Sequence, residues 1–133
     1  MDLYAQNILD RYKNPLNKGK SVKPTLKRNE ANHSCGDAAE IKLAVKDDRL
    51  SDYSFDGAGC TISMAAADMI GDLIKGMTLD EILALTKENI YEILGIEISM
   101  RRSKCALLSL LAIQNAILEK RKEPLKTWND YHL

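Results

Sequence analysis

The stretch EIKLAVKDDRLSDYSFDGAGC, residues 40–60, decides the fold. Its first part, EIKLAVK (40–46), alternates between apolar residues and polar or small ones, which is the pattern of a half-buried strand. Asp47-Asp48-Arg49 suits a turn, and the alternation resumes over residues 51–57. We therefore predict two strands that pair as an antiparallel hairpin.

The apolar spacing changes after Cys60. Residues 62–73 are apolar at helical intervals, and Gly76 is well placed to end that helix. Thr78 begins a short helix with a capping box, and Thr86 begins another, which a glycine at position 95 would end. The pattern thus predicts a run of helices behind the hairpin.

The strongest helix pattern covers residues 103–121, with one apolar face. Upstream of the hairpin, the spacing predicts a helix over residues 3–12 and a third strand over 26–32. Strands followed by helices indicate an α+β domain, in which a small antiparallel sheet of about three strands carries helices on one face. We expect one domain over residues 1–133, with a charged C-terminal tail at 119–133.

The composition limits the class of protein. Apolar residues make up 45% of the 133 residues, enough for a core that needs no disulfides. Basic and acidic residues balance at 19 each, so the net charge gives no indication of binding to nucleic acid or to a membrane. We expect no signal peptide at the start of the chain, and the apolar stretch 106–118 is too short to span a bilayer. We expect a cytoplasmic protein whose three cysteines are free thiols.

All three cysteines fall at the ends of predicted elements. Cys35 lies in a loop before the first hairpin strand, Cys60 lies where a strand gives way to a helix, and Cys105 lies in the first turn of the last helix. Buried structural cysteines are the plainer interpretation. Thiolates, however, are soft ligands that suit zinc and iron–sulfur centres, and Asp37 follows Cys35 across a flexible glycine. Three thiolates and this carboxylate would complete a tetrahedral metal site.

The surroundings of these ligands suggest how the site would work. Helix N-termini should lower the thiol pKa of Cys60 and Cys105, and Lys104 adds a cation. One hard oxygen ligand, from Asp37, should weaken the grip on a soft centre and favour release. His33, close to Cys35, could be a ligand or a proton relay, and a plain loop histidine is the simpler interpretation.

Four motifs together resemble the U-type scaffold family (IscU, SufU and the N-terminal domain of NifU) over residues 3–120. They are Tyr12-Lys13-Asn14-Pro15, Cys35-Gly36-Asp37, the run from Gly57 to Ser63, and Lys104-Cys105-Ala106. The resemblance implies an α+β scaffold domain with its metal site at one end of the sheet. It assigns the site to Cys35, Asp37, Cys60 and Cys105.

The resemblance is divided between two subfamilies. Lys104 and the N-terminal segment are similar to SufU-type proteins, whereas the lack of an insertion before Cys105 is similar to IscU-type proteins. Residues 96–100 lack the proline-containing segment that IscU-type proteins present to a dedicated chaperone, so chaperone binding is not implied. IscU-type proteins assemble a [2Fe–2S] cluster, and SufU-type proteins hold zinc and accept sulfur from a cysteine desulfurase. Cys35 would accept the sulfur in the SufU interpretation, and Cys105 in the IscU one.

Three hypotheses for the function follow. The first is a scaffold that binds iron or a [2Fe–2S] cluster and passes the cluster to apo iron–sulfur proteins. The second is a zinc-bound sulfur acceptor, with sulfurtransferase activity, that works with a cysteine desulfurase. The third is a structural zinc domain that binds another protein.

Overall fold

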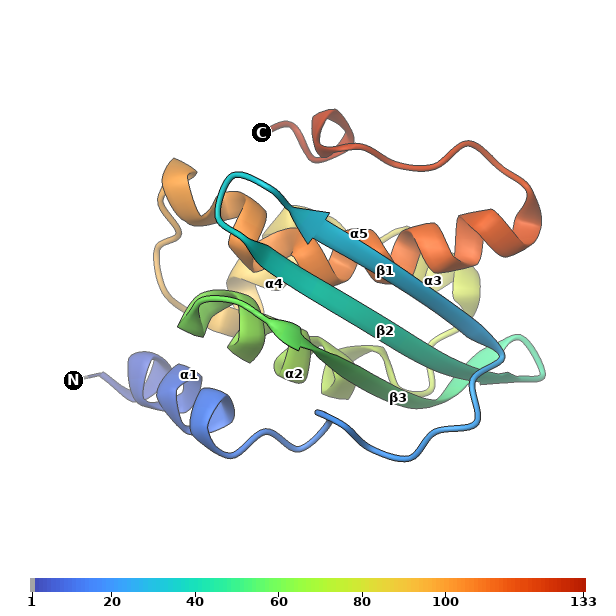
Figure 1. The fold of residues 1–133 in the computed structure, drawn as a ribbon, viewed down its shortest axis with the longest axis horizontal. Coiled ribbons are helices and arrows are strands. Elements are labelled where there is room, and N and C mark those ends of the chain that lie inside the picture. Colours follow the sequence, from blue (N-terminus) through green and yellow to red (C-terminus); the bar gives the residue numbers. More distant parts are fainter. Residues whose placement is uncertain (1) are drawn as a thin grey trace.

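A three-stranded antiparallel sheet forms the front of the molecule in the computed structural model, which describes residues 2–133 (Figure 1). The strands are β1 (Leu26–Asn32), β2 (Asp37–Lys46) and β3 (Arg49–Ala58), in that spatial order. Two long helices cover one face: α2 (Thr61–Ile74) packs on β3, and α5 (Ser103–Arg121) packs on β1 and β2. The predicted α+β architecture is confirmed, including the third strand.

The β2–β3 hairpin turns where the sequence predicts. Asp47 and Asp48 both have positive φ, 53° and 63°, and Lys46 pairs with Arg49. Two central residues with positive φ are the mark of the tight hairpin turn whose twist matches that of the strands. Aspartate tolerates this backbone region because its short side chain can hydrogen-bond locally.

The smaller elements are three helices that follow the predicted signals and two short 3₁₀ turns that the sequence patterns did not predict. They are α1 (Leu3–Lys13), α3 (Leu79–Leu83), α4 (Lys87–Leu94) and the 3₁₀ turns η1 (Met100–Arg102) and η2 (Trp128–Tyr131). Thr78 and Glu81 form the predicted capping box of α3, and Gly95 ends α4 with a φ of 69°. A Cβ at Gly95 would lie only 2.0 Å from the ring of Tyr4, so a glycine here lets α1 approach the end of α4.

The α5 helix is buried on all sides rather than on one face. Every residue from Cys105 to Leu118 is buried, because the sheet lies on one side and helices lie on the other. The polar Gln114 is tolerated in this setting because its amide donates to the carbonyls of Ile82 and Leu85, both at 3.0 Å. No helix within residues 2–133 has the length and apolarity needed to cross a membrane.

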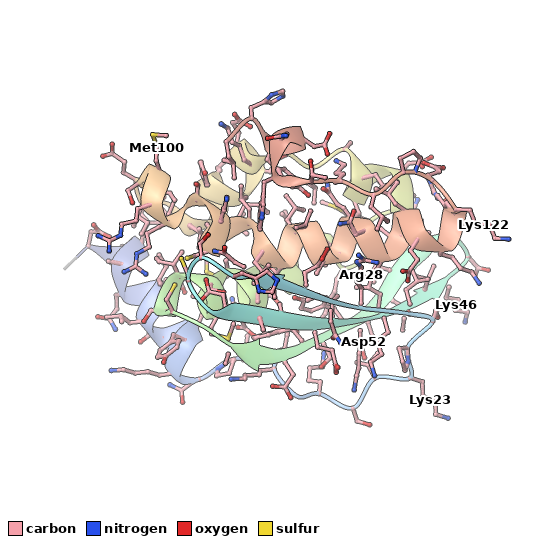
Figure 2. The ribbon with its side chains drawn as sticks, turned by 45° about the horizontal axis from the view of Figure 1, so that its top comes forward. Lys23, Arg28, Lys46, Asp52, Met100 and Lys122 are labelled. Carbon is pink, nitrogen blue, oxygen red and sulfur yellow. The ribbon has the colours of Figure 1, made fainter. Side chains whose placement is uncertain are left out.

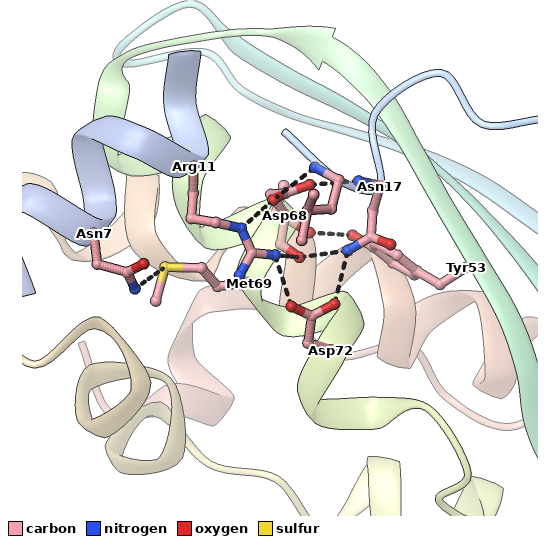
Figure 3. A network of polar contacts seen from close by, with 9 residues as sticks. Asn7, Arg11, Asn17, Tyr53, Asp68, Met69 and Asp72 are labelled. Atoms are coloured by element: carbon pink, nitrogen blue, oxygen red, sulfur yellow. Dashed lines mark hydrogen bonds and ion pairs between the residues drawn. The ribbon is translucent and has the colours of Figure 1, made fainter. Parts of the chain in front are cut away.

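A buried carboxylate fastens the N-terminal segment to α2 (Figure 3). Asp68, which is fully buried, accepts hydrogen bonds from Arg11 Nε at 2.5 Å and from the backbone N–H groups of Leu16 at 3.1 Å and Asn17 at 2.7 Å. The chain then runs along the outer edge of β3, where the Phe55 N–H donates to the carbonyl of Asn17. The segment between α1 and β1 is therefore held tightly to the body.

Candidate metal centre

The connection between β1 and β2 presents the first two candidate ligands. The carbonyl of Asn32 accepts hydrogen bonds from the N–H groups of Cys35 at 3.2 Å and Gly36 at 2.9 Å, which closes a tight turn. Gly36 has a φ of 73°, a region that glycine enters without steric cost. The turn leaves Cys35 exposed and starts β2 at Asp37, whose side chain is buried.

The junction of β3 and α2 brings Cys60 beside Asp37. Cys60 is the N-cap of α2, and its Sγ accepts the N–H of Ser63 at 3.5 Å. The Cys60 N–H donates to Asp37 Oδ1 at 3.1 Å. A Cβ at Gly59 would lie 2.6 Å from that same oxygen, so only a glycine allows the junction to come so close.

Cys105 completes the group from the opposite layer. It lies in the first turn of α5 and is 1% exposed. Its Sγ, the Sγ of Cys35 and a carboxylate oxygen of Asp37 all lie within 4.8 Å of one another, and these three residues could form a metal site. Cys60 lies outside this set of three but is tied to it through Asp37.

The centre lies at the end of the molecule where α5 begins. Figure 2 shows Met100, at the start of the 3₁₀ turn that leads into α5, at one end, and Lys46 and Lys122 at the other. The group therefore occupies one end of the sheet, where the β1–β2 turn meets the N-terminus of α5. His33, considered above as a ligand, is exposed and is not among the three grouped residues.

Burial changes the expected electrostatics of Cys105. Burial is the main cause that raises the pKa of its thiol well above the usual value, and the nearby Asp37, Cys35 and Cys60 add to it. The prediction that the helix N-terminus lowers this pKa is wrong, because the loss of hydration outweighs the helix dipole. Without a cation, Cys105 is therefore a neutral thiol at physiological pH.

The cation that faces the thiols is Arg102 rather than Lys104. The nearby Cys60 raises the pKa of the Arg102 guanidinium, and Cys105 and Cys35 add to the effect. Lys104 instead places its Nζ 5.9 Å from the ring centroid of Trp128 in the tail. The sequence could have indicated Arg102, because it precedes Cys105 by three residues, which is about one helical turn.

These environments predict different thiol reactivities. In the metal-free protein at neutral pH, we expect iodoacetamide to modify exposed Cys35 first and buried Cys105 at least about tenfold more slowly, because the thiolate is the reacting form. Peptide mapping by mass spectrometry over time measures both rates. The rates should converge in urea, and equal rates in the folded protein would contradict the burial of Cys105.

Comparison with known proteins identifies the family. The model of the NifU-like N-terminal domain family matches residues 3–126. The iron–sulfur cluster assembly scaffold protein IscU 1 of Archaeoglobus fulgidus is 31% identical over 117 residues, covering 88% of this chain and 76% of that protein. The zinc-dependent sulfurtransferase SufU of Bacillus subtilis is 31% identical over 135 residues, covering 89% and 91%.

A longer relative and a solved structure agree with this assignment. The nitrogen fixation protein NifU of Trichormus azollae is 30% identical over 96% of this chain, which spans 45% of that protein. A crystal structure of a SUF-system scaffold protein from Fervidobacterium islandicum has the same fold, with a TM-score of 0.74 over 84% of this chain and 94% of that one, at 24% identity. The sequence resemblance to U-type scaffolds is confirmed, and the chain belongs to the family of NifU-like N-terminal domains.

Proposed function

We propose that this chain is an iron–sulfur cluster assembly scaffold that takes iron or a [2Fe–2S] cluster as its cargo and passes the cluster to apo-proteins. The ligands would be Cys35, Asp37, Cys60 and Cys105. The observation that carries the proposal is the approach of two sulfur atoms and one carboxylate oxygen, from two layers of the fold, to within 4.8 Å of one another. Thiolates with one hard oxygen suit iron and zinc.

Different residues of the centre would hold the cargo and allow its release. Asp37 Oδ1 is held by the Cys60 N–H, whereas Asp37 Oδ2 is buried and has no hydrogen-bond partner within the described residues, as a ligand atom would need. Buried Cys105 shields the inner side from water, and exposed Cys35 forms the outer side. Cargo would therefore enter and leave past Cys35, and the carboxylate would weaken the hold on a soft centre.

Anaerobic reconstitution tests the scaffold function. Incubation with ferrous iron and sulfide should give a coloured, oxygen-sensitive species with sulfur-to-iron charge-transfer absorption. Transfer of the cluster to an apo-ferredoxin, followed by absorption and circular dichroism, should then deplete the donor. A colourless product from protein with three intact thiols would contradict the proposal.

A zinc-bound sulfur acceptor is the second candidate, and the exposure of Cys35 favours it. In this function the Cys35 thiolate attacks the outer sulfur of a persulfide on a cysteine desulfurase. The sulfur–sulfur bond of that persulfide breaks, its cysteine leaves as a thiolate, and Cys35 carries the new persulfide. Cys105, the other candidate acceptor, is 1% exposed and could not meet a partner without opening the site.

Desulfurase kinetics separate the two candidates. An acceptor should accelerate alanine release by the desulfurase, and Cys35→Ala should abolish the acceleration. Failure of the wild-type protein to accelerate the enzyme would remove this second candidate and leave the scaffold proposal standing. Thiols that must stay reduced support a cytoplasmic location for either function.

Metal removal tests the third hypothesis, a structural zinc domain. We expect the chelated protein to keep its fold, because one continuous core joins the sheet to α2 and α5 without using the ligands. Far-ultraviolet circular dichroism before and after chelation measures this. Loss of secondary structure on chelation would support a structural metal, since such domains unfold without it.

A further inference from the structure

The amide nitrogen of a buried asparagine next to the centre has no hydrogen-bond partner within residues 2–133. Asn32, the last residue of β1, is 3% exposed. Its Oδ1 accepts the N–H of Ser34 at 3.3 Å, which fixes the orientation of the amide, because only an oxygen can accept. Its Nδ2 has no partner among residues 2–133. Unpaired buried donors are rare in folded proteins and need a physical reason.

An acceptor that could pair with this N–H group lies opposite Asn32 on the neighbouring strand, β2. Asn32 pairs in register with Asp37, and both side chains are buried. Asp37 Oδ2 and Asn32 Nδ2 are the two buried side-chain atoms that lack a partner in the described part of the chain. Residues directly opposite each other in an antiparallel pair have neighbouring side chains. An unpaired donor and an unpaired acceptor therefore belong to neighbouring side chains.

We propose that Asn32 is a positioning residue of the metal centre, whose Nδ2 donates a hydrogen bond to Asp37 Oδ2 when the centre is loaded. The inference rests on the proposed metal-binding function. A carboxylate oxygen has two lone pairs, so Oδ2 can bind a cation and still accept an N–H. The Cys60 N–H already holds Oδ1 from the other side. With both oxygens held, the Asp37 carboxylate would be fixed in orientation.

A neutral amide suits this position better than a charged donor. A lysine or arginine at position 32 would compete with the metal for the Asp37 carboxylate and repel the cation. An amide orients the ligand without adding charge to a buried site. Asn32 would therefore act on metal affinity through Asp37 alone.

A double-mutant cycle tests whether Asn32 affects metal affinity through Asp37. The proteins are wild type, Asn32→Ala, Asp37→Ala and the double variant, each titrated with zinc against a chromophoric chelator. We expect Asn32→Ala to weaken zinc binding about tenfold in the wild-type background, as outer partners of metal ligands do. In the Asp37→Ala background the same change should have less than a twofold effect. The cobalt(II) absorption spectrum should also change on Asn32→Ala only when Asp37 is present.

Two further variants separate positioning from folding. Asn32→Ser keeps an oxygen that can accept the Ser34 N–H but shortens the donor, so it should lose affinity as Asn32→Ala does. Asn29→Ala, at an exposed position of the same strand, should leave affinity unchanged. The metal-free Asn32 variants should unfold at the wild-type temperature.

The outcomes distinguish this inference from the function on which it rests. If the wild type does not bind zinc or cobalt(II) through its thiols, the metal-binding proposal itself fails. If the wild type binds but Asn32→Ala binds equally well, the positioning role is refuted and the centre remains. Equal losses in both backgrounds would show that Asn32 acts independently of Asp37, which also overturns the inference.

Discussion

Cys105→Ala is expected to weaken zinc binding at least about 100-fold and to prevent a stable cluster from forming. Structural zinc in small domains contributes roughly 10–16 kcal/mol, so one thiolate of four ligands should contribute about 3 kcal/mol. Cys105 is the candidate ligand that α5 supplies, and its sulfur is the inner member of the group with Cys35 and Asp37. Its loss would leave the centre open on the helix side. Chelator competition with zinc and anaerobic reconstitution measure the two effects.

A second buried position on the same helix provides the control. Ser109, one turn further along α5, is 3% exposed and lies outside the metal group, so Ser109→Ala should bind zinc as the wild type does. Alanine favours the helix in both variants. Wild-type affinity in Cys105→Ala would exclude Cys105 as a ligand, and an equal loss in both variants would point to a general disturbance of α5.

The parts of the fold that could be predicted from sequence depend on local patterns. The β2–β3 hairpin follows from alternation and a two-aspartate turn, and the caps of α3 and α4 follow from Thr78 and Gly95. The grouping of Cys35 with Cys105 was also predictable, because both stand at element ends and because the motifs resemble a known family. The hairpin and the helix caps need only residues close together in the chain, whereas the grouping of the two distant cysteines also needs the family resemblance.

The parts that could not be predicted depend on contacts between distant segments. Burial of α5 on all sides raises the pKa of Cys105, although its sequence position alone suggests the opposite. Lys104 lies over the ring of Trp128 in the tail, and Arg102 faces the thiols instead. Gln114 is a polar residue in this buried helix, and its acceptors lie about thirty residues earlier in the chain.

Two buried aspartates show how the same residue type serves different ends. Asp68 receives donors on both oxygens, from Arg11 and from the backbone at Leu16 and Asn17. Within residues 2–133, Asp37 receives a donor on one oxygen, and its other oxygen has no hydrogen-bond partner. A fully paired carboxylate anchors a structure, whereas a half-paired one beside two thiols can still bind a cation. The difference comes from the partners rather than from burial, since both side chains are almost completely buried.

Asp68→Ala is therefore expected to destabilise the metal-free protein by about 3–5 kcal/mol, the usual effect of removing one member of a buried ion pair. The change would remove the closest ion-pair partner of Arg11 and leave the N–H groups of Leu16 and Asn17 without an acceptor. The N-terminal segment should then detach from α2. Urea unfolding followed by circular dichroism measures the free energy, and proteolysis near residues 11–17 reports the detachment.

Asp72 offers a matched comparison, because it also pairs with Arg11, at 2.8 Å, but its side chain is 46% exposed. Solvent screens such a pair, so Asp72→Ala should destabilise the protein by about 1 kcal/mol at most. Equal effects of the two variants would mean that contact with Arg11, rather than burial of the carboxylate, sets the stability. A loss below about 1 kcal/mol in Asp68→Ala would show that the N-terminal segment is held by its apolar contacts, such as buried Ile8, and not by this network.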